Sequence, residues 1–186
     1  GTWTVPSVFS LLTGMSVREH GWDLPAARIG KYPKLPPAQM LASVLQRAGF
    51  ETTGLYSNPY LAEALGFDRG FDTWLRSHDK SVVKNLRREI ASRDKSKRQF
   101  YYIHILGPHS PLKPNEATRE RHGLESEWFE ESRGLGIGVA KRNKKPGARL
   151  AYMKSYAGVV EETDQLLADI LAEFEPLGDS VALVVT

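Results

Sequence analysis

The fold is decided by the stretch Gln99-Phe100-Tyr101-Tyr102-Ile103-His104-Ile105-Leu106, which the pair Gly107-Pro108 ends. Such a continuous run of aromatic and β-branched residues favours a buried β-strand. Shorter runs of the same character extend from Thr52 to Tyr56 and from Val181 to Val185. The sequence therefore predicts three strands that are widely separated along the chain.

Between the predicted strands, apolar residues recur at helical spacing. They repeat every three or four positions from Leu41 to Ala48, and Gly49 supplies the stop. A second repeat runs from Tyr156 to Phe174. Helices that alternate with apolar strands predict an α/β fold with a mainly parallel sheet.

The composition excludes several classes of protein. The 186 residues are 41% hydrophobic and 25% charged, enough for one sizeable core, and the net charge of only +3 gives no reason to expect nucleic acid as a partner. The sequence contains no cysteine, which excludes disulfides, thiolate metal sites and a cysteine nucleophile. No apolar run approaches the roughly 20 residues of a membrane span, so we expect none in this segment.

Both ends of the sequence look cut. Residues 1–4 contain no initiator methionine, and the last residues, from Val181 to Thr186, stop inside the third predicted strand. We therefore expect residues 1–186 to form a single partial domain of a longer protein, with both flanks missing. Residues 112–149 are rich in charged residues and glycine, and we expect them to form an excursion over the surface.

Thr4 is the first candidate for chemistry. Pro6 suits the first turn of a helix, and Gly14 marks its end. A hydroxyl at a helix N-terminus lies where backbone N–H groups favour an anion such as phosphate or sulfate. On the residues alone, capping the helix is the more frequent role of such a threonine, and both roles stay open.

The segment from Thr4 to Gly14 resembles the nucleophile segment of the sulfatase family, within the alkaline phosphatase superfamily. The family form is Cys or Ser, any residue, Pro, Ser, Arg, and then a helix that ends in Leu-Thr-Gly. Further segments resemble the family in the same order: Arg18 to Gly21, Leu41 to Phe50, Ser57 to Tyr60, Gly66 to Asp72, Tyr102 to Pro111, and Tyr156 to Thr186. The resemblance implies part of a three-layer α/β/α sandwich with a mainly parallel sheet.

The resemblance also implies metal-dependent hydrolysis of sulfate or phosphate esters, whether small molecules or glycans. Thr4 stands where the family has the Cys or Ser that is oxidised to formylglycine, so no formylglycine is expected there. Thr4 would be both nucleophile and metal ligand, and His109, in Pro-His-x-Pro, would bind or protonate the ester oxygen. Ser57 and Asn58 would line the pocket.

The remaining metal ligands are expected outside this chain, which alone is expected to be inactive. Calcium is the first choice of metal, and magnesium, manganese and zinc are alternatives. Val8 stands where the family has arginine, and Gly54 to Ser57 replaces a Gly-Lys-Trp-His stretch. These departures keep two alternatives open: a phosphoryl or phosphoglycerol-type transferase that uses Thr4, and a degenerate binding module without activity.

Two further features are interpreted as structural. His104 lies on an apolar strand and is predicted to be a core or supporting histidine with satisfied hydrogen bonds. The basic residues from Lys80 to Arg98 surround an apolar stripe, so they are predicted to form the solvated face of an amphipathic helix. Because no aromatic residues alternate with these charges, the pattern does not indicate nucleic-acid binding.

Overall fold

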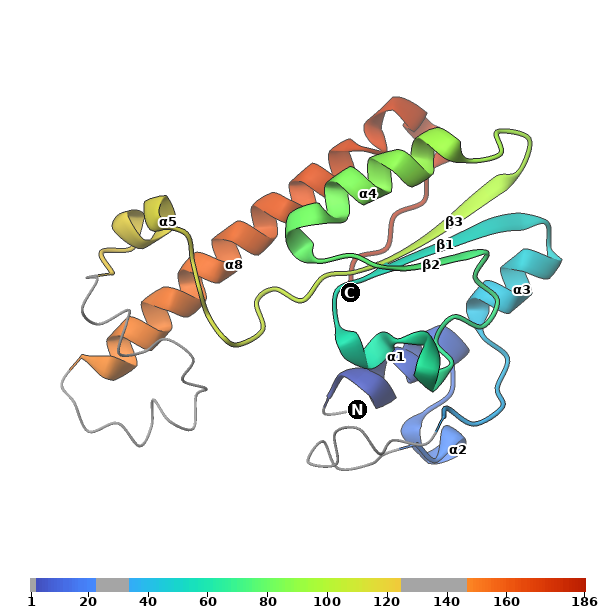
Figure 1. Ribbon diagram of the computed structural model, residues 1–186, viewed down its shortest axis with the longest axis horizontal. Coiled ribbons are helices and arrows are strands. Elements are labelled where there is room, and N and C mark those ends of the chain that lie inside the picture. Colours follow the sequence, from blue (N-terminus) through green and yellow to red (C-terminus); the bar gives the residue numbers. More distant parts are fainter. Residues whose placement is uncertain (1–2, 23–33, 125–146) are drawn as a thin grey trace. The chain divides into compact units, whose positions relative to one another are not determined.

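The computed structural model describes residues 3–22, 34–124 and 147–186 (Figure 1). The chain divides into two compact units, Gly1–Ile105 and Leu106–Thr186. In the described residues, the first unit contains the sheet and several helices, and the second unit contains helices without a strand. Each unit is held together by contacts among its own residues.

Three parallel strands form the sheet of the first unit. β1 (Phe50–Tyr56) lies at the centre, between β2 (Thr73–Arg76) and β3 (Arg98–His104), and it pairs with both in parallel. The predicted parallel α/β fold is therefore confirmed. Both of the strands predicted in this half of the sequence form as expected, within two residues of their predicted ends.

The sequence patterns missed one strand and predicted one that does not form. β2 is only four residues long, Thr-Trp-Leu-Arg, and such a short run shows no clear period. The prediction of a strand over Val181–Val185 is wrong for this structure, in which these residues are neither helix nor strand and Val184 is 86% exposed. A β-strand needs a hydrogen-bonded neighbour, and within the described residues this segment pairs with none.

Helices cover both faces of the sheet. α1 (Thr4–Thr13) and α3 (Leu41–Arg47) lie on one face and α4 (Asp79–Ser92) on the other (Figure 1). The short helix α2 (Val17–His20) follows α1 and is held by a capping box. The one-turn 3₁₀ helices η1 (Pro59–Leu61) and η2 (Glu63–Leu65) follow β1. This arrangement gives the three layers that the resemblance implies.

The predicted ends of α1 and α3 agree with the structure. Gly14 adopts a left-handed conformation with φ of 70°, and its N–H donates to the carbonyl of Ser10, which ends α1. Gly49, with φ of 85°, likewise follows α3. In α4, Val82 and Leu86 are fully buried while the basic residues are exposed, so the predicted amphipathic helix is confirmed.

Aromatic rings fill the space between the sheet and α1. Trp74 stacks on Tyr56 with centroids 4.8 Å apart and on Tyr102 at 6.0 Å, and its indole N–H donates to the carbonyl of Leu61. Phe9 of α1 is fully buried in the adjoining core. Gly54 of β1 lies opposite Trp74 in the register, where the absence of a side chain leaves room for the indole.

The second unit is organised by one long helix, α8 (Ala148–Ala172), and the 3₁₀ helix η3 (Glu175–Ser180) follows it. α5 (Glu116–Arg121) packs on α8, and Glu161 accepts hydrogen bonds from Arg121 and His122. The excursion predicted at residues 112–149 includes α5 and the start of α8, and its residues 125–146 lie outside the described part. α8 begins eight residues before the predicted helix.

None of the helices in the described residues is long and apolar enough to cross a membrane.

The Gly54→Ala substitution is expected to destabilise the first unit. The new methyl carbon would stand 2.1 Å from Cε3 of Trp74, so the stacked rings must shift, at a cost of about 2 to 3 kcal/mol. Urea denaturation monitored by tryptophan fluorescence would measure the loss. As a control, Trp74→Leu removes the opposing ring. The double variant should lose clearly less than the sum of the two single losses, and additive losses would contradict this account.

Candidate active site

Thr4 and Asn58 meet at the carboxyl end of the sheet, although 54 positions separate them in the sequence. The Nδ2 group of Asn58 donates a hydrogen bond of 3.0 Å to Oγ1 of Thr4. Asn58 is two residues beyond the end of β1, and Thr4 is the first residue of α1. The structure thus brings together two of the four predicted site residues.

Thr4 does not cap α1. The N-cap position is occupied by Trp3, and the helix begins at Thr4 itself. The helical hydrogen bonds start with the N–H of Ser7, which donates to the carbonyl of Trp3. The N–H groups before Ser7 have no carbonyl partner within the helix. Because Pro6 has no N–H, these are the N–H groups of Thr4 and Val5. The half-buried Thr4 hydroxyl thus lies at the positive end of a ten-residue helix, where an anion is favoured.

Asn58 is oriented by its second hydrogen bond. Its Oδ1 accepts from the backbone N–H of Tyr60 at 3.0 Å and thereby caps η1. An N–H group can donate only to the oxygen of an amide, so this bond fixes which side of the side chain carries the NH₂ group. That NH₂ group faces Thr4, and Asn58, 4% exposed, holds it there.

Ser57 connects the end of β1 to the start of α4. Its N–H donates to the carbonyl of His104, and its hydroxyl contacts the carbonyl oxygen of Ser77 at 2.8 Å and the carboxylate of Asp79. Asn85 in turn donates to the hydroxyl of Ser77. Ser57 is only 3% exposed. Its hydroxyl is therefore engaged within the protein, as is the amide of Asn58.

His109 belongs to the second unit. Its side chain is exposed, and its Nδ1 lies within hydrogen-bond distance of the carbonyl oxygen of Ser110. A carbonyl oxygen only accepts, so Nδ1 carries the proton and Nε2 is the ring atom available to a ligand. An exposed imidazole with one fixed nitrogen can bind or protonate an oxygen atom through the other.

The other two histidines of interest have structural surroundings. His20 is 6% exposed, packs on Phe9, and bonds to both the hydroxyl of Ser10 and the N–H of Trp22. At the end of β3, burial lowers the pKa of His104. The Nδ1 atom of His104 is buried without a hydrogen-bond partner. Burial thus favours the neutral imidazole of His104, but the prediction of a histidine with satisfied hydrogen bonds is wrong for Nδ1.

A metal site is not complete within the described residues. They contain no group of three or more His, Cys, Asp or Glu side chains that could hold an ion. The hydroxyl of Thr4 is a single oxygen donor, whereas calcium and magnesium take six or more oxygen ligands. The residues present therefore do not by themselves fit a metal ion.

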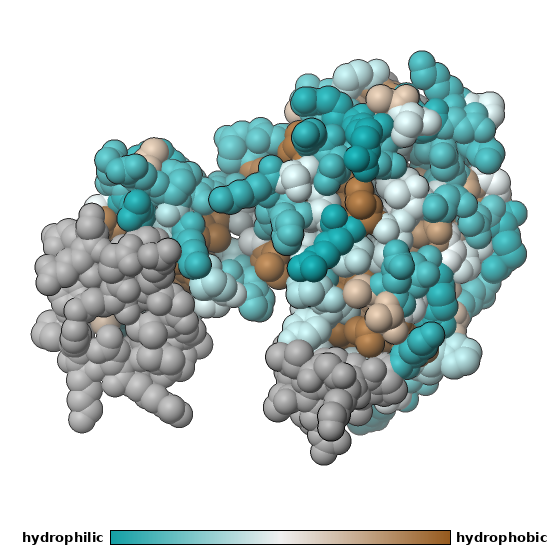
Figure 2. Space-filling model, viewed as in Figure 1, coloured by the Kyte–Doolittle hydropathy of each residue, from teal (hydrophilic) through white to brown (hydrophobic). Residues whose placement is uncertain are grey.

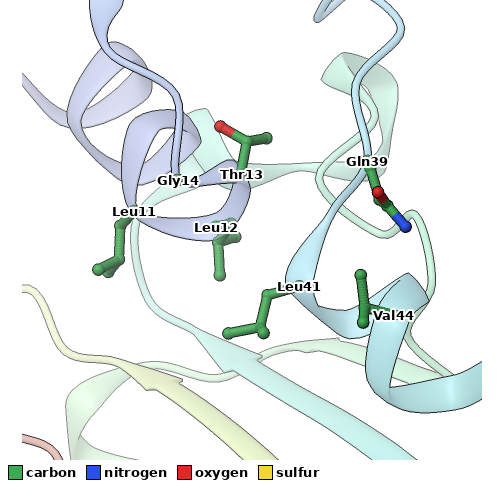
Figure 3. A pocket seen from close by; sticks show the side chains of 7 residues that line it. All are labelled: Leu11, Leu12, Thr13, Gly14, Gln39, Leu41 and Val44. Carbon is green, nitrogen blue, oxygen red and sulfur yellow. The ribbon is translucent and has the colours of Figure 1, made fainter. Parts of the chain in front are cut away.

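A hollow at the opposite end of α1 does not belong to this site. It is lined by Leu11, Leu12, Thr13, Gly14, Gln39, Leu41 and Val44, and Figure 3 shows the side chains of Leu12, Leu41 and Val44 beside one another. At 1.5 Å per residue, the ten residues of α1 place it about 14 Å from Thr4. Its lining contains no titratable group, so it offers no acid or base.

The family model described as Sulfatase matches residues 1–186, the whole of this sequence. The chain belongs to the sulfatase family. Val8, at the position of the family arginine, is 8% exposed and packs in the hydrophobic core beside Phe9. This member of the sulfatase family therefore has an apolar contact where the resemblance implies an arginine.

Solved structures share the fold of this sulfatase-family chain. The protein BT4656, in complex with its substrate D-glucosamine-2-N,6-O-disulfate, superposes with a TM-score of 0.65 at 16% identity, over 96% of this chain and 54% of that one. A second protein, BT33494S-sulf, is described in work on glycosaminoglycan metabolism by Bacteroides thetaiotaomicron. It gives a TM-score of 0.61 at 18% identity, over 94% of this chain and 46% of that one.

The C-terminal periplasmic domain of EptC from Escherichia coli, in complex with zinc, gives a TM-score of 0.54 at 16% identity. That likeness covers 77% of this chain and 40% of the other. This sulfatase-family chain therefore spans about half the length of the solved structures it resembles. No curated protein matches it significantly.

Sequence reasoning missed Ser77 and Asp79 as partners of Ser57. Both follow β2, and that strand was not predicted, so nothing in the pattern placed them at the carboxyl edge of the sheet. Recognition of β2 would have supplied the signal, because polar residues directly after parallel strands gather at one edge.

The neutral state of His104 predicts a loss of stability on acidification. Its folded pKa lies below the ordinary 6.5, so between those two values the unfolded chain binds more protons than the folded one. The contribution of His104 is present above about pH 6.5 and is lost as the pH falls toward the folded pKa. Urea denaturation between about pH 8 and pH 5 should show a steeper decline for the native sequence than for His104→Gln, and parallel declines would contradict the assignment.

Proposed function

We propose that this chain forms part of a metal-dependent hydrolase of sulfate or phosphate esters, with Thr4 as the nucleophile. The observation that carries the proposal is the hydrogen bond from Asn58 to Thr4 at the N-terminus of α1. A threonine that only capped the helix would direct its oxygen to backbone N–H groups of the first turn. Thr4 instead is the first helical residue, and its oxygen accepts from a side chain outside the helix.

Asn58 serves as a positioning residue for Thr4. Its NH₂ group occupies one lone pair of Oγ1 and sets the direction of the other lone pair and of the hydroxyl proton. A fixed donor also stabilises negative charge on that oxygen as the proton leaves. Through its contacts with Ser77 and Asp79, Ser57 ties the end of β1 to the start of α4. The backbone at the next residue, Asn58, is thereby held in place.

Covalent substitution at Thr4 would form a bond between Oγ1 and the sulfur or phosphorus atom, and the hydroxyl proton of Thr4 would pass to water. The bond from that atom to the alcohol oxygen would break, and the alcohol would take up a proton. We assign this proton to Nε2 of His109 in its doubly protonated, imidazolium form, on the basis of the resemblance to the Pro-His-x-Pro segment and of its exposed ring. Water would then release sulfate or phosphate from Thr4.

A divalent metal ion is included in this proposal because the chain belongs to the sulfatase family. Thr4 would be the one ligand that this chain supplies, and the other ligands would come from outside the described residues. Calcium is proposed first, with magnesium, manganese or zinc as alternatives, and a zinc-bound relative of the same fold is consistent with a divalent ion. For substrate, the neighbour in complex with a disulfated glucosamine and the one described in work on glycosaminoglycan metabolism support a glycan or small-molecule sulfate ester.

A second candidate function is phosphoryl or phosphoglycerol-type transfer to an acceptor other than water. It is favoured by the threonine itself, because a hydroxyl can attack phosphorus without conversion to formylglycine. The two candidates differ in the final acceptor, and transfer differs from sulfate hydrolysis in the adduct as well. Mass spectrometry of the protein after incubation with phosphodiesters would detect a phosphorylated Thr4 peptide, and sulfate turnover without such an adduct would exclude transfer.

Removal of the Thr4 hydroxyl is expected to abolish activity. In the full-length protein supplied with divalent metal, Thr4→Ala should lower kcat/KM for an aryl sulfate or aryl phosphate by about 10³-fold or more. Asn58→Ala keeps the nucleophile but loses its donor, so a smaller decrease of about 10- to 100-fold, mainly in kcat, is expected. Chelation of the metal should stop turnover, and its return should restore it.

Thr13→Ala supplies the matched control for Thr4. Thr13 lies at the other end of α1, where its hydroxyl donates to the carbonyl of Phe9, and its loss should leave turnover unchanged. Full activity of Thr4→Ala would overturn the assignment of the nucleophile. Absence of turnover on every ester, in folded protein with each metal, would favour the non-catalytic binding module.

The role of His109 predicts a dependence on the leaving group. An alcohol that leaves as a stable anion needs little protonation, so His109→Gln should slow a nitrophenyl ester by less than about 10-fold. For an alkyl or sugar ester the decrease should reach about 10² to 10⁴-fold. Steady-state rates over a series of leaving groups would measure this difference. An equal decrease for all members of the series would show that His109 does not supply the proton.

A further inference from the structure

The positive charge of the chain is concentrated on and just after α4. Residues 79–98 contain eight of the 25 Lys and Arg residues but only three of the 22 Asp and Glu residues. Since the whole chain carries a net charge of +3, the rest of it is slightly negative. One helix and the turn behind it therefore account for all of the positive excess.

Four of these residues form one exposed face of α4, which we call the basic face: Lys80, Lys84, Arg87 and Arg88. Their spacing of four, seven and eight positions places them on the same side of the helix, over a length of about 12 Å. Val82 and Leu86, on the opposite side, are fully buried. Hydrophilic residues cover most of the visible surface in this region (Figure 2).

Three of the four basic residues that follow α4, Arg93, Lys97 and Arg98, have partners within the protein. Lys97 lies 4.0 Å from Asp94, and Arg98 donates to the carbonyl of Ala48 and lies over the ring of Phe50. On the basic face, Arg88 pairs with Glu89 at 2.8 Å. Lys80 and Lys84 form no ion pair with any acidic side chain in the described part of the chain. The first turns of α4 therefore carry two lysines that are open to an outside anion.

The basic face starts at the candidate active site. α4 begins directly after β2, and the carboxylate of Asp79, its first residue, bonds to Ser57. Asn58, the next residue after Ser57, holds Thr4. Thr4, Asn58 and α4 all belong to the first unit, so the start of the basic face and the nucleophile lie at the same edge of one sheet.

We propose that the basic face binds the sulfate groups of an extended sulfated polysaccharide, one ester of which is presented to Thr4. This proposal rests on the proposed function, since it extends the substrate from one ester to a chain of them. Lysines spaced along a helix act as point charges that suit a row of anions. Nucleic acid is disfavoured because no aromatic residue alternates with the charges on this face, whereas bases stack on such residues.

The experiment compares two sets of variants in the full-length protein. Lys80, Lys84 and Arg88 are changed together to Gln, and Lys95→Gln/Lys97→Gln serves as the control because it removes charge from the turn after α4. A heparin-derived decasaccharide is the probe, and its Kd is measured by calorimetry at several salt concentrations. The triple variant should bind at least about 10-fold more weakly, and the slope of log Kd against log salt should fall by about one for each lost contact.

Turnover of a small aryl ester should be unchanged in the triple variant, because none of its three residues belongs to the site around Thr4. Equal Kd values for the triple variant and the control would overturn the proposal, as would binding of single-stranded DNA with the same affinity as the decasaccharide. Thr4→Ala separates the two proposals, because it should lose turnover and keep decasaccharide binding. If the triple variant loses decasaccharide binding but neither it nor the native protein turns over any ester, the basic face is supported as a binding surface and the proposed hydrolase activity is rejected.

Discussion

The hydrogen-bond ladder of β1 with its two neighbours is the constraint on which the rest of the site depends. The ladder continues past the strand ends, where Ser57 donates to the carbonyl of His104 and Ser77 donates to the carbonyl of Tyr56. This extension fixes the backbone at Ser57, and Asn58, the next residue, reaches Thr4. A shift of register would turn each side chain to the other face of the sheet and separate this pair.

The same register explains why the sheet has its particular residues. Gly54 lies opposite Trp74, and the missing side chain lets the indole stack between Tyr56 and Tyr102. These rings form the surface against which α1 packs through Phe9 and its neighbours in the core. The N-terminus of α1, and Thr4 with it, is therefore positioned by the packing of α1 on the aromatic rings of the sheet.

Part of the site could be predicted from the sequence, and part could not. The segment around Thr4 and its place in the sulfatase family were readable because the spacing of Pro6, Leu12 and Gly14 is local. The pairing of Asn58 with Thr4 was not readable, since it joins residues 54 positions apart. Asp79 was missed for a related reason: the four residues of β2 were too few to show a period, so the edge that they create was not expected.

The sequence by itself determined the α/β class, the helices α1 and α3, the central strand and its neighbour β3, and the two faces of α4. Each of these follows from apolar periodicity and from stops such as Gly14, which are properties of a few consecutive residues. Only the tertiary structure decided that the Thr4 hydroxyl faces Asn58 rather than its own helix, that Val8 is a core residue, and that Val181–Val185 forms no strand. These outcomes depend on which partner is within reach, and a chain acquires its distant partners only when it folds.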